Sequence, residues 1–189
     1  MRIVGGRLKG RTLKAPKGEN IRPTADRIRE SIFNMLVHRI DGCLLKDVAV
    51  IDVFCGTGAL GLEAISRGAK YGIFIDNKSS ALKSTRANSR ALGLDGEVIT
   101  LKLNAGRLKS PTKLVKFPAA LAFLDPPYNK GLVSVALSGL RDKGWLESGA
   151  FCVVEIASKE LFEVPKNFKV LLERKFGVAR ILFLQMDSL

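Results

Sequence analysis

The sequence predicts an α/β protein with a Rossmann-like fold, in which a mostly parallel sheet ends in an antiparallel hairpin. Seven short apolar runs have the length and composition of strands, and they lie at residues 48–53, 71–75, 97–101, 119–124, 150–156, 169–174 and 179–186. Segments with helical spacing separate most of these runs, at residues 58–67, 78–92, 107–116 and 131–142. Such alternation implies parallel strands joined by right-handed crossovers, with helices on both faces of the sheet. The last two runs have no helix between them, so we expect them to form an antiparallel hairpin at one sheet edge.

The length of the chain limits it to one main domain. With 189 residues, 47% of them hydrophobic, it can bury one substantial core but not two ordinary ones. We expect residues 41–189 to form this main domain and residues 1–40 to form a small basic appendage.

Within the appendage, residues 1–15 alternate short apolar and basic positions around glycines, which predicts a small hairpin or an extended arm. Pro23 marks a turn, and Thr24 is placed to cap a helix that runs to about residue 38. Apolar residues recur on one face of that helix, namely Ile28, Ile32, Phe33, Leu36 and Val37.

The charge of the chain points to a polyanionic partner. Its 31 Lys and Arg against 18 Asp and Glu give a formal charge of +13, a field that attracts nucleic acid. Residues 1–40 alone hold ten basic and three acidic residues, so we expect this end to grip RNA or DNA. The alternative is a solvated basic face with no partner.

The cysteine pattern and the hydropathy favour a cytoplasmic protein without metal. Cys43, Cys55 and Cys152 are widely spaced and odd in number, so neither a disulfide framework nor a zinc site is predicted. No apolar stretch approaches the roughly 20 residues that span a bilayer, and the N-terminus lacks the apolar core of a signal peptide.

A glycine-rich turn joins the first strand of the main domain to its first helix. Gly56, Gly58 and Gly61 form the string G-x-G-x-x-G, and Asp76 follows Gly56 by 20 residues, so a nicotinamide dinucleotide is one candidate ligand. Asp52 lies four residues before Gly56, at the strand end that approaches a cofactor. A carboxylate there would repel a pyrophosphate but accept hydrogen bonds from a cationic amino-acid group, which favours S-adenosylmethionine.

Further polar groups complete the predicted cofactor site. Asp76 is placed to accept both ribose hydroxyls. Asn104, after the third strand, could read the edge of adenine, although a helix cap or a turn is the alternative role. The predicted cofactor-binding residues are Asp52, Phe54, Gly56, Thr57, Gly58, Asp76, Asn77, Asn104 and Ala105.

The fourth strand ends in a tetrapeptide with catalytic chemistry, Asp125, Pro126, Pro127 and Tyr128. Its position, at the carboxyl end of a central strand, is where ligands bind in open α/β sheets. Two prolines fix the backbone and remove two amide donors. If Asp125 and the carbonyl of Pro126 each accept one N–H of an amino group on a base, the nitrogen can pyramidalise and its lone pair becomes nucleophilic. Tyr128 can stack on a base held outside its helix; the alternative is a proline turn with an incidental aromatic.

Taken together, these motifs resemble one known family. The likeness extends over nearly the whole chain, through residues 1–11, 22–34, 52–64, 125–128 and 144–146. The sequence resembles the RsmD-type bacterial 16S ribosomal RNA guanine-N2 methyltransferases. Asp76 stands where a Glu is common in that family, and Tyr128 stands where Phe also occurs; both substitutions preserve the chemistry.

The resemblance implies a class I S-adenosylmethionine-dependent methyltransferase fold over residues 41–189, with seven strands and the cofactor across their carboxyl ends. It implies methylation of a guanine N2 in 16S ribosomal RNA, within a small-subunit particle. We expect Arg7, Lys9, Arg11 and Lys14 to contact phosphates, and Arg22, Thr24 and Arg29 to lie nearer the target base. We also expect removal of residues 1–17 to weaken RNA binding while sparing cofactor binding.

Three other functions compete with this one. A DNA adenine or cytosine amino-methyltransferase uses the same tetrapeptide, but the chain has no room for a separate recognition domain. A protein-glutamine methyltransferase uses a related tetrapeptide, usually with Asn in place of Asp. A non-enzymatic RNA-binding ribosome-assembly factor would keep the basic arm but not the intact cofactor motifs.

Overall fold

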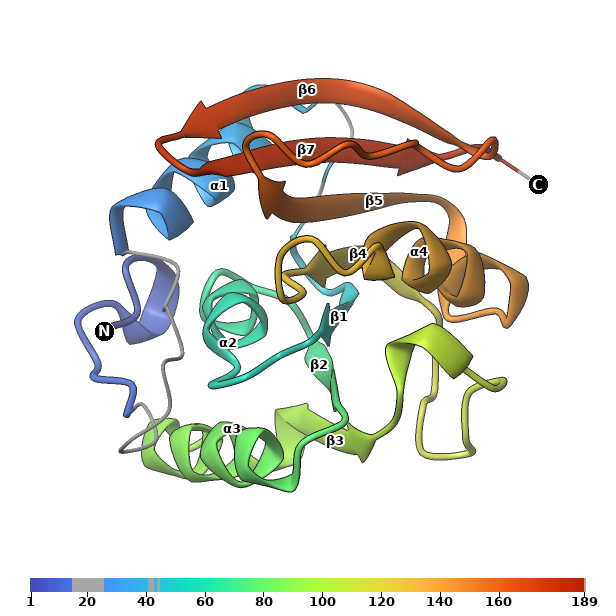
Figure 1. Ribbon diagram of the computed structural model, residues 1–189. Coiled ribbons are helices and arrows are strands. Elements are labelled where there is room, and N and C mark those ends of the chain that lie inside the picture. The colour runs from blue at the N-terminus through green and yellow to red at the C-terminus, as the bar shows by residue number, and fades with distance from the viewer. Residues whose placement is uncertain (15–25, 41–42, 44, 189) are drawn as a thin grey trace.

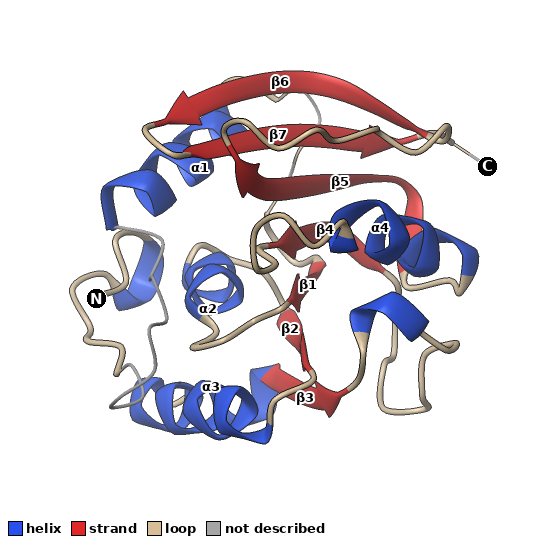
Figure 2. Ribbon diagram, in the orientation of Figure 1, coloured by secondary structure: helices blue, strands red, loops and turns tan. Residues whose placement is uncertain are grey.

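A seven-stranded sheet lies at the centre of the molecule, with helices on both faces (Figures 1 and 2). The structure, a computed structural model, describes residues 1–14, 26–40, 43 and 45–188. The strand order is β3-β2-β1-β4-β5-β7-β6. The strands are β1 Ala49–Val53, β2 Tyr71–Asp76, β3 Val98–Lys102, β4 Ala119–Leu124, β5 Leu146–Ala157, β6 Phe168–Phe176 and β7 Ala179–Met186. The α-helices are α1 Asp26–His38, α2 Ala59–Ser66, α3 Ser79–Leu92 and α4 Leu132–Asp142.

Strand direction confirms the predicted fold class. The pairs β1–β2, β1–β4, β2–β3 and β4–β5 are parallel, and β7 is antiparallel to both of its neighbours, β5 and β6. All residues of β1 are buried, as expected for a central parallel strand that helices cover on both faces. The C-terminal hairpin of β6 and β7 forms one edge of the sheet, with β6 outermost.

Each face of the sheet has its own hydrophobic core. On one face, α1, α2, α3 and the N-terminal residues pack around Phe33, Phe74 and Phe123. On the other face, α4 packs with the fully buried Trp145. No helix in the described part of the chain is long and apolar enough to cross a membrane.

The helix predicted over residues 107–116 is wrong. A three-residue 3-10 turn, Ala105–Arg107, is followed by irregular chain up to β4. Pro111 explains the difference, because proline lacks an amide donor and its ring disfavours helical backbone in the preceding residue. Tertiary bonds hold this segment instead: the indole N–H of Trp145 donates to the carbonyl of Lys109 at 2.8 Å, and the hydroxyl of Tyr71 donates to that of Phe117 at 2.8 Å.

Residues 1–14, called the N-terminal segment below, fold back on themselves and pack on the sheet. Arg2 and Thr12 form a single antiparallel bridge, and a 3-10 turn occupies Gly6–Leu8. Ile3 and Leu13 are buried in the same core as α1 and α2. The segment is therefore hairpin-like, as predicted, but it is built into the core. The predicted turn at Pro23 and helix cap at Thr24 lie outside the described residues.

Candidate active site

Three neighbouring parallel strands bring the predicted site residues to one edge of the sheet. Val53 of β1 is the register partner of Ile75 in β2 and of Leu124 in β4. The residues that follow these three are Phe54, Asp76 and Asp125, so the glycine loop, the acidic strand end and the tetrapeptide meet at the carboxyl edge. This is the edge where ligands bind in open α/β sheets.

The cofactor loop, residues 54–58, has an unusual backbone. Phe54 has φ of 63°, although left-handed backbone is uncommon for a bulky residue. Two backbone bonds fix the loop: the amide of Cys55 donates to the carbonyl of Ile75 at 3.1 Å, and that of Gly58 donates to the carbonyl of Cys55 at 2.7 Å. Strained backbone of this kind persists where the surroundings hold it, and it concentrates at ligand sites.

The glycines of the loop differ in what they require. Among the described residues, a Cβ built on Gly56 would have a single neighbour within 4 Å, the carbonyl oxygen of Phe54 at 4.0 Å, so this part of the structure leaves space for a ligand. A Cβ on Gly58 would lie 2.9 Å from the methyl of Thr85, and one on Gly61 would lie 2.5 Å from the ring of Phe74. Gly56 thus fits a ligand-facing role, whereas Gly58 and Gly61 allow close packing beneath the loop.

Asp76 links the end of β2 to the cofactor loop. Its carboxylate accepts the amide of Gly56 at 3.1 Å and the amide of Lys78 at 2.8 Å. Each carboxylate oxygen keeps a second lone pair, and the residue is partly exposed beside the exposed Asn77. The arrangement fits the predicted ribose contact.

Asp52 lies beneath the loop. It is 2% exposed, and its Oδ2 accepts the amide of Gly61 in the first turn of α2 at 2.9 Å. Burial raises the pKa of Asp52 to about 8; the hydrogen bond from Gly61 opposes the rise, and the nearby charge of Asp76 adds to it. Its burial therefore favours support of the loop over the direct cofactor contact predicted from the sequence.

Asn104 caps the 3-10 turn after β3. Its Oδ1 accepts the amide of Gly106 at 2.9 Å, which is the turn role that the sequence left open. The side chain is exposed, whereas Ala105 is 5% exposed. The predicted adenine contact stays a prediction.

The tetrapeptide follows β4 directly and is held from β5. Pro126 is buried, Pro127 is exposed, and Asp125 and Tyr128 are partly buried. The hydroxyl of Tyr128 donates to Oε1 of Glu155 in β5 at 2.5 Å.

The chain just beyond the tetrapeptide has a second acidic anchor. The backbone N–H of Asn129, a residue with φ of 57°, donates to Oε2 of Glu160 at 2.9 Å. Sequence reasoning missed both Glu155 and Glu160. A charged residue inside the apolar run of β5 was the available signal for Glu155, because such residues are rarely placed in central strands without a partner.

The basic residues of the N-terminal segment are exposed. Arg7 forms an ion pair with Glu97 at 2.5 Å, and Arg11 donates to the carbonyl of Ala91 at 3.0 Å. Lys9 and Lys14 are exposed as well. These side chains are available to phosphates. Two further residues expected near the target base, Arg22 and Thr24, lie outside the described residues.

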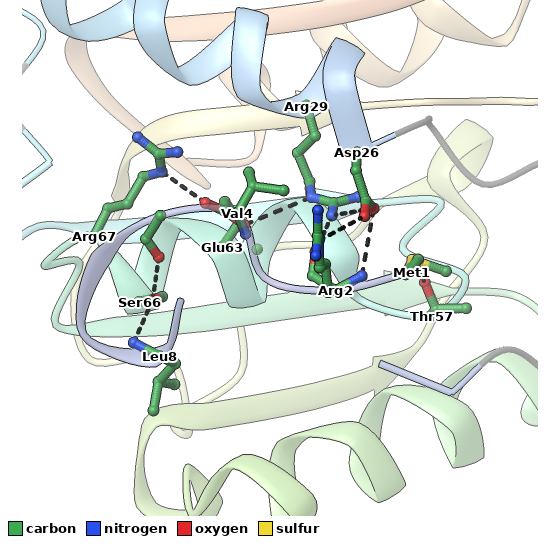
Figure 3. A network of polar contacts seen from close by, with 12 residues as sticks. Met1, Arg2, Val4, Leu8, Asp26, Arg29, Thr57, Glu63, Ser66 and Arg67 are labelled. Atoms are coloured by element: carbon green, nitrogen blue, oxygen red, sulfur yellow. Dashed lines mark hydrogen bonds and ion pairs between the residues drawn. The ribbon is translucent and has the colours of Figure 1, made fainter. Parts of the chain in front are cut away.

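Arg29 is the exception, and the RNA contact predicted for it is wrong. Its side chain is fully buried, and its guanidinium pairs with Asp26 at 2.9 Å and Glu63 at 3.6 Å and donates to the carbonyl of Arg2 (Figure 3). Glu63 also pairs with Arg67 at 2.7 Å. Helical spacing in the sequence predicts that Arg29 lies on a helix rich in basic residues. It does not predict that the side chain points toward α2, because this direction depends on tertiary packing.

The cysteines and the acidic residues were both candidates for metal binding. All three cysteines are buried free thiols, and burial raises their pKa, to about 11 for Cys43. Among the described residues, no group of three or more His, Cys, Asp or Glu side chains is arranged to hold a metal ion.

Comparison with known proteins gives consistent matches over the whole chain. A family model described as "Conserved hypothetical protein 95" matches residues 1–185. The chain is 32% identical over 183 residues to the Ribosomal RNA small subunit methyltransferase D of Escherichia coli strain K12, which covers 94% of this chain and 85% of that protein. The solved structure of yhhF from Escherichia coli, described as a methyltransferase, has a TM-score of 0.84 at 32% identity, covering 100% of this chain and 99% of that one.

A more distant solved structure has the same fold. The magnesium protoporphyrin IX methyltransferase of Synechocystis PCC 6803, solved with bound S-adenosylmethionine, has a TM-score of 0.61 at 16% identity. The match covers 85% of this chain and 79% of that one. At this identity the likeness concerns the fold alone.

Proposed function

This chain belongs to the family described as Conserved hypothetical protein 95, the RsmD-type family that its motifs resemble, and we propose that it is an S-adenosylmethionine-dependent methyltransferase of ribosomal RNA. We propose further that its acceptor is the exocyclic N2 amino group of a guanine in 16S ribosomal RNA, within a small-subunit particle. One observation carries the proposal. The tetrapeptide Asp125–Tyr128 follows the strand next to the cofactor loop, at the same edge of the sheet.

The residues at this edge fit the proposed cofactor. The open space beside Gly56 admits a ligand close to the backbone, and Asp76 offers a partly exposed carboxylate beside it. When bound there, S-adenosylmethionine supplies an electrophilic methyl group on a sulfonium. Gly56 and Asp76 would hold its ribose and amino-acid portions, and Asn104 with Ala105 would lie toward its adenine.

The tetrapeptide would activate the acceptor. An amino nitrogen on guanine is a poor nucleophile because its lone pair is delocalised into the ring. Asp125 and the carbonyl of Pro126 would each accept one N–H, which holds the nitrogen in a pyramidal shape and frees its lone pair. Asp125 would also stabilise positive charge as it develops on that nitrogen. Tyr128 would support the base by stacking, with its ring oriented by Glu155.

The basic N-terminal segment supports a nucleic-acid substrate. Arg7, Lys9, Arg11 and Lys14 are exposed on one segment, and the whole chain carries a formal charge of +13. Contacts of this kind bind phosphates without reading sequence. Recognition of one nucleotide would then come from the shape of the assembled particle and from the pocket beside the tetrapeptide.

Transfer of a labelled methyl group tests the proposal. The protein is incubated with S-adenosylmethionine carrying a tritiated methyl group and with small ribosomal subunits from a strain that lacks the gene. The expected result is label in 16S ribosomal RNA that, after digestion to nucleosides, elutes with N2-methylguanosine. Subunits from the parent strain are the matched control and should accept little label. Label on duplex DNA in place of RNA would favour a DNA amino-methyltransferase, and absence of transfer to either would refute the proposal.

A further inference from the structure

One end of the N-terminal segment contacts the cofactor loop, and the other contacts α3. At one end, the hydroxyl of Thr57 lies 3.8 Å from the sulfur of Met1, within reach of a weak hydrogen bond (Figure 3). At the other end, Lys14 contacts Asn88 of α3 through its backbone amide and its carbonyl. The 3-10 turn in the middle of the segment contacts the C-terminal end of α2, where the amide of Leu8 donates to the hydroxyl of Ser66.

Asn88 joins the segment to the loop directly. It is 1% exposed, and its side chain makes three hydrogen bonds. Its Oδ1 accepts the amide of Lys14 at 2.8 Å, and its Nδ2 donates to the carbonyls of Lys14 and Thr57, each at 3.0 Å. One buried amide therefore satisfies both backbone groups of Lys14 and one backbone group of the cofactor loop.

Thr85, one turn earlier on α3, provides a useful contrast. Its hydroxyl donates to the carbonyl of Gly56 at 3.1 Å. Two successive carbonyls of the cofactor loop, those of Gly56 and Thr57, are thus held from α3. The hydrogen bond from Thr85 does not involve the N-terminal segment. In contrast, the Nδ2 of Asn88 that donates to Thr57 also donates to the carbonyl of Lys14.

The middle of the segment is fixed to α2, which begins immediately after the loop. The amide of Val4 donates to Oε2 of Glu63 at 2.8 Å (Figure 3), and the hydroxyl of Ser66 donates to the carbonyl of Gly5 at 2.6 Å. Glu63 is fully buried and pairs with Arg29 from α1. A displacement of the segment would therefore disturb α2 as well as the loop that precedes it.

We infer that Asn88 is a positioning residue through which residues 1–14 hold the cofactor loop in the conformation that binds the cofactor. The identity of that cofactor rests on the function proposed above. The N-terminal segment is then part of the cofactor site, in addition to its proposed contacts with RNA. It follows that removal of residues 1–17 weakens cofactor binding, contrary to the expectation from the sequence.

Calorimetric titration with S-adenosylmethionine tests the inference. In Asn88→Ala the carbonyl of Thr57 and both backbone groups of Lys14 lose their buried partner, so the Kd should rise about tenfold or more. Ser89→Ala is the matched control, because Ser89 is also buried on α3 but its hydroxyl donates to Arg86 within the same helix. Its Kd should equal that of the wild type. Lys14→Pro leaves Asn88 intact and removes the amide that donates to it, so its Kd should also rise.

The pattern of the titrations decides between the possible roles of Asn88. Wild-type affinity in both Asn88→Ala and Lys14→Pro would overturn the inference. A loss in Asn88→Ala alone would show that Asn88 holds the loop without the segment, which also contradicts it. Absence of binding to the wild type would instead be a failure of the proposed function.

Hydrogen exchange gives a second test that does not depend on measuring a Kd. In the wild-type protein, saturating S-adenosylmethionine should slow amide exchange in residues 1–14 as well as in residues 54–58. Without any ligand, Asn88→Ala should speed exchange in both segments relative to Ser89→Ala. Exchange that changes in the loop while residues 1–14 stay unaffected in both experiments would refute the coupling.

Discussion

Tyr128 and Asp52 each have a local environment that predicts a measurable property of the protein. Tyr128 shares a short hydrogen bond with Glu155, so its ring is oriented from β5 before a base arrives. Asp52 is buried beneath the cofactor loop, and its pKa is raised to about 8. Neither environment follows from local sequence, because both depend on residues that are distant along the chain.

The role of Tyr128 divides between its ring and its hydroxyl. Tyr128→Phe keeps the stacking face and loses one hydrogen bond, so we expect single-turnover methylation to slow by several-fold, equivalent to about 1 kcal/mol. Tyr128→Ala loses the ring as well, and stacking contributes roughly 1–3 kcal/mol. Glu155→Gln keeps an oxygen that can accept the hydrogen bond from the Tyr128 hydroxyl. Its single-turnover rate should therefore equal or exceed that of Tyr128→Phe. If Tyr128→Phe proved as slow as Tyr128→Ala, stacking would not be the role of the ring.

The pKa of Asp52 gives a dependence of stability on pH. Because burial raises its pKa in the folded state to about 8, the contribution of Asp52 to stability is fully present below pH 4. That contribution is lost as the pH rises toward 8. Asp52→Asn cannot ionise and keeps an oxygen for the amide of Gly61, so its melting temperature should fall less between pH 4 and 8 than that of the wild type. Parallel melting curves for the two proteins across this range would contradict the assignment.

Among the elements, the N-terminal segment and the chain between β3 and β4 show where sequence patterns suffice and where they fail. The alternation of apolar and basic residues predicted a hairpin-like segment, and Ile3 and Leu13 are its buried positions. Pattern alone did not predict that this segment is built into the core. No helix forms at 107–116 because Pro111 interrupts the apolar spacing that predicted one.

The exposed bases of the N-terminal segment should set the salt dependence of RNA binding. Replacing Arg7, Lys9 and Arg11 together with Ala should weaken binding to small subunits. The replacement should also flatten the plot of log affinity against log salt by up to about 0.7–0.9 for each phosphate that these side chains neutralise in the wild type. The matched control replaces Lys113, Lys116 and Lys143, which are exposed bases outside this segment. Equal weakening in both variants would mean that net charge acts alone and that the segment does not bind RNA specifically.

In the whole molecule, most of the fold was predictable and most of the site's support was not. Strand and helix order, the parallel centre and the antiparallel hairpin all follow from apolar runs and their spacing. The cofactor loop, Asp76 and the tetrapeptide could be predicted as candidate site residues because their motifs are local. Asn88, Glu155 and the buried pair of Arg29 with Glu63 depend on side-chain direction in the packed structure, which a linear pattern does not encode.

The buried ion pair predicts a cost to the stability of the whole molecule. Arg29→Ala leaves the buried Glu63 with Arg67 as an ion-pair partner and the amide of Val4 as a hydrogen-bond donor. The free energy of unfolding should therefore decrease by an amount near the lower end of the range of roughly 3–5 kcal/mol for a broken buried pair. Arg90→Ala removes an arginine from an exposed pair with Asp95 and should change stability by about 0.5 kcal/mol or less. Urea unfolding of the two variants gives the comparison. Unchanged stability in Arg29→Ala, with loss of RNA binding, would restore Arg29 to the RNA surface.

Single-turnover methyl transfer to small subunits tests whether Asp125 is catalytic. Asp125→Ala removes an acceptor at the developing positive charge. At roughly 1.5–3 kcal/mol the rate should fall by about tenfold to a hundredfold or more, with the Kd for S-adenosylmethionine unchanged. Asp125→Asn keeps one acceptor oxygen and should retain more activity than Asp125→Ala. Asp142→Ala, an exposed carboxylate at the end of α4, should transfer at the wild-type rate. Full activity in Asp125→Ala would show that the tetrapeptide is a structural turn and that Asp125 has no catalytic role.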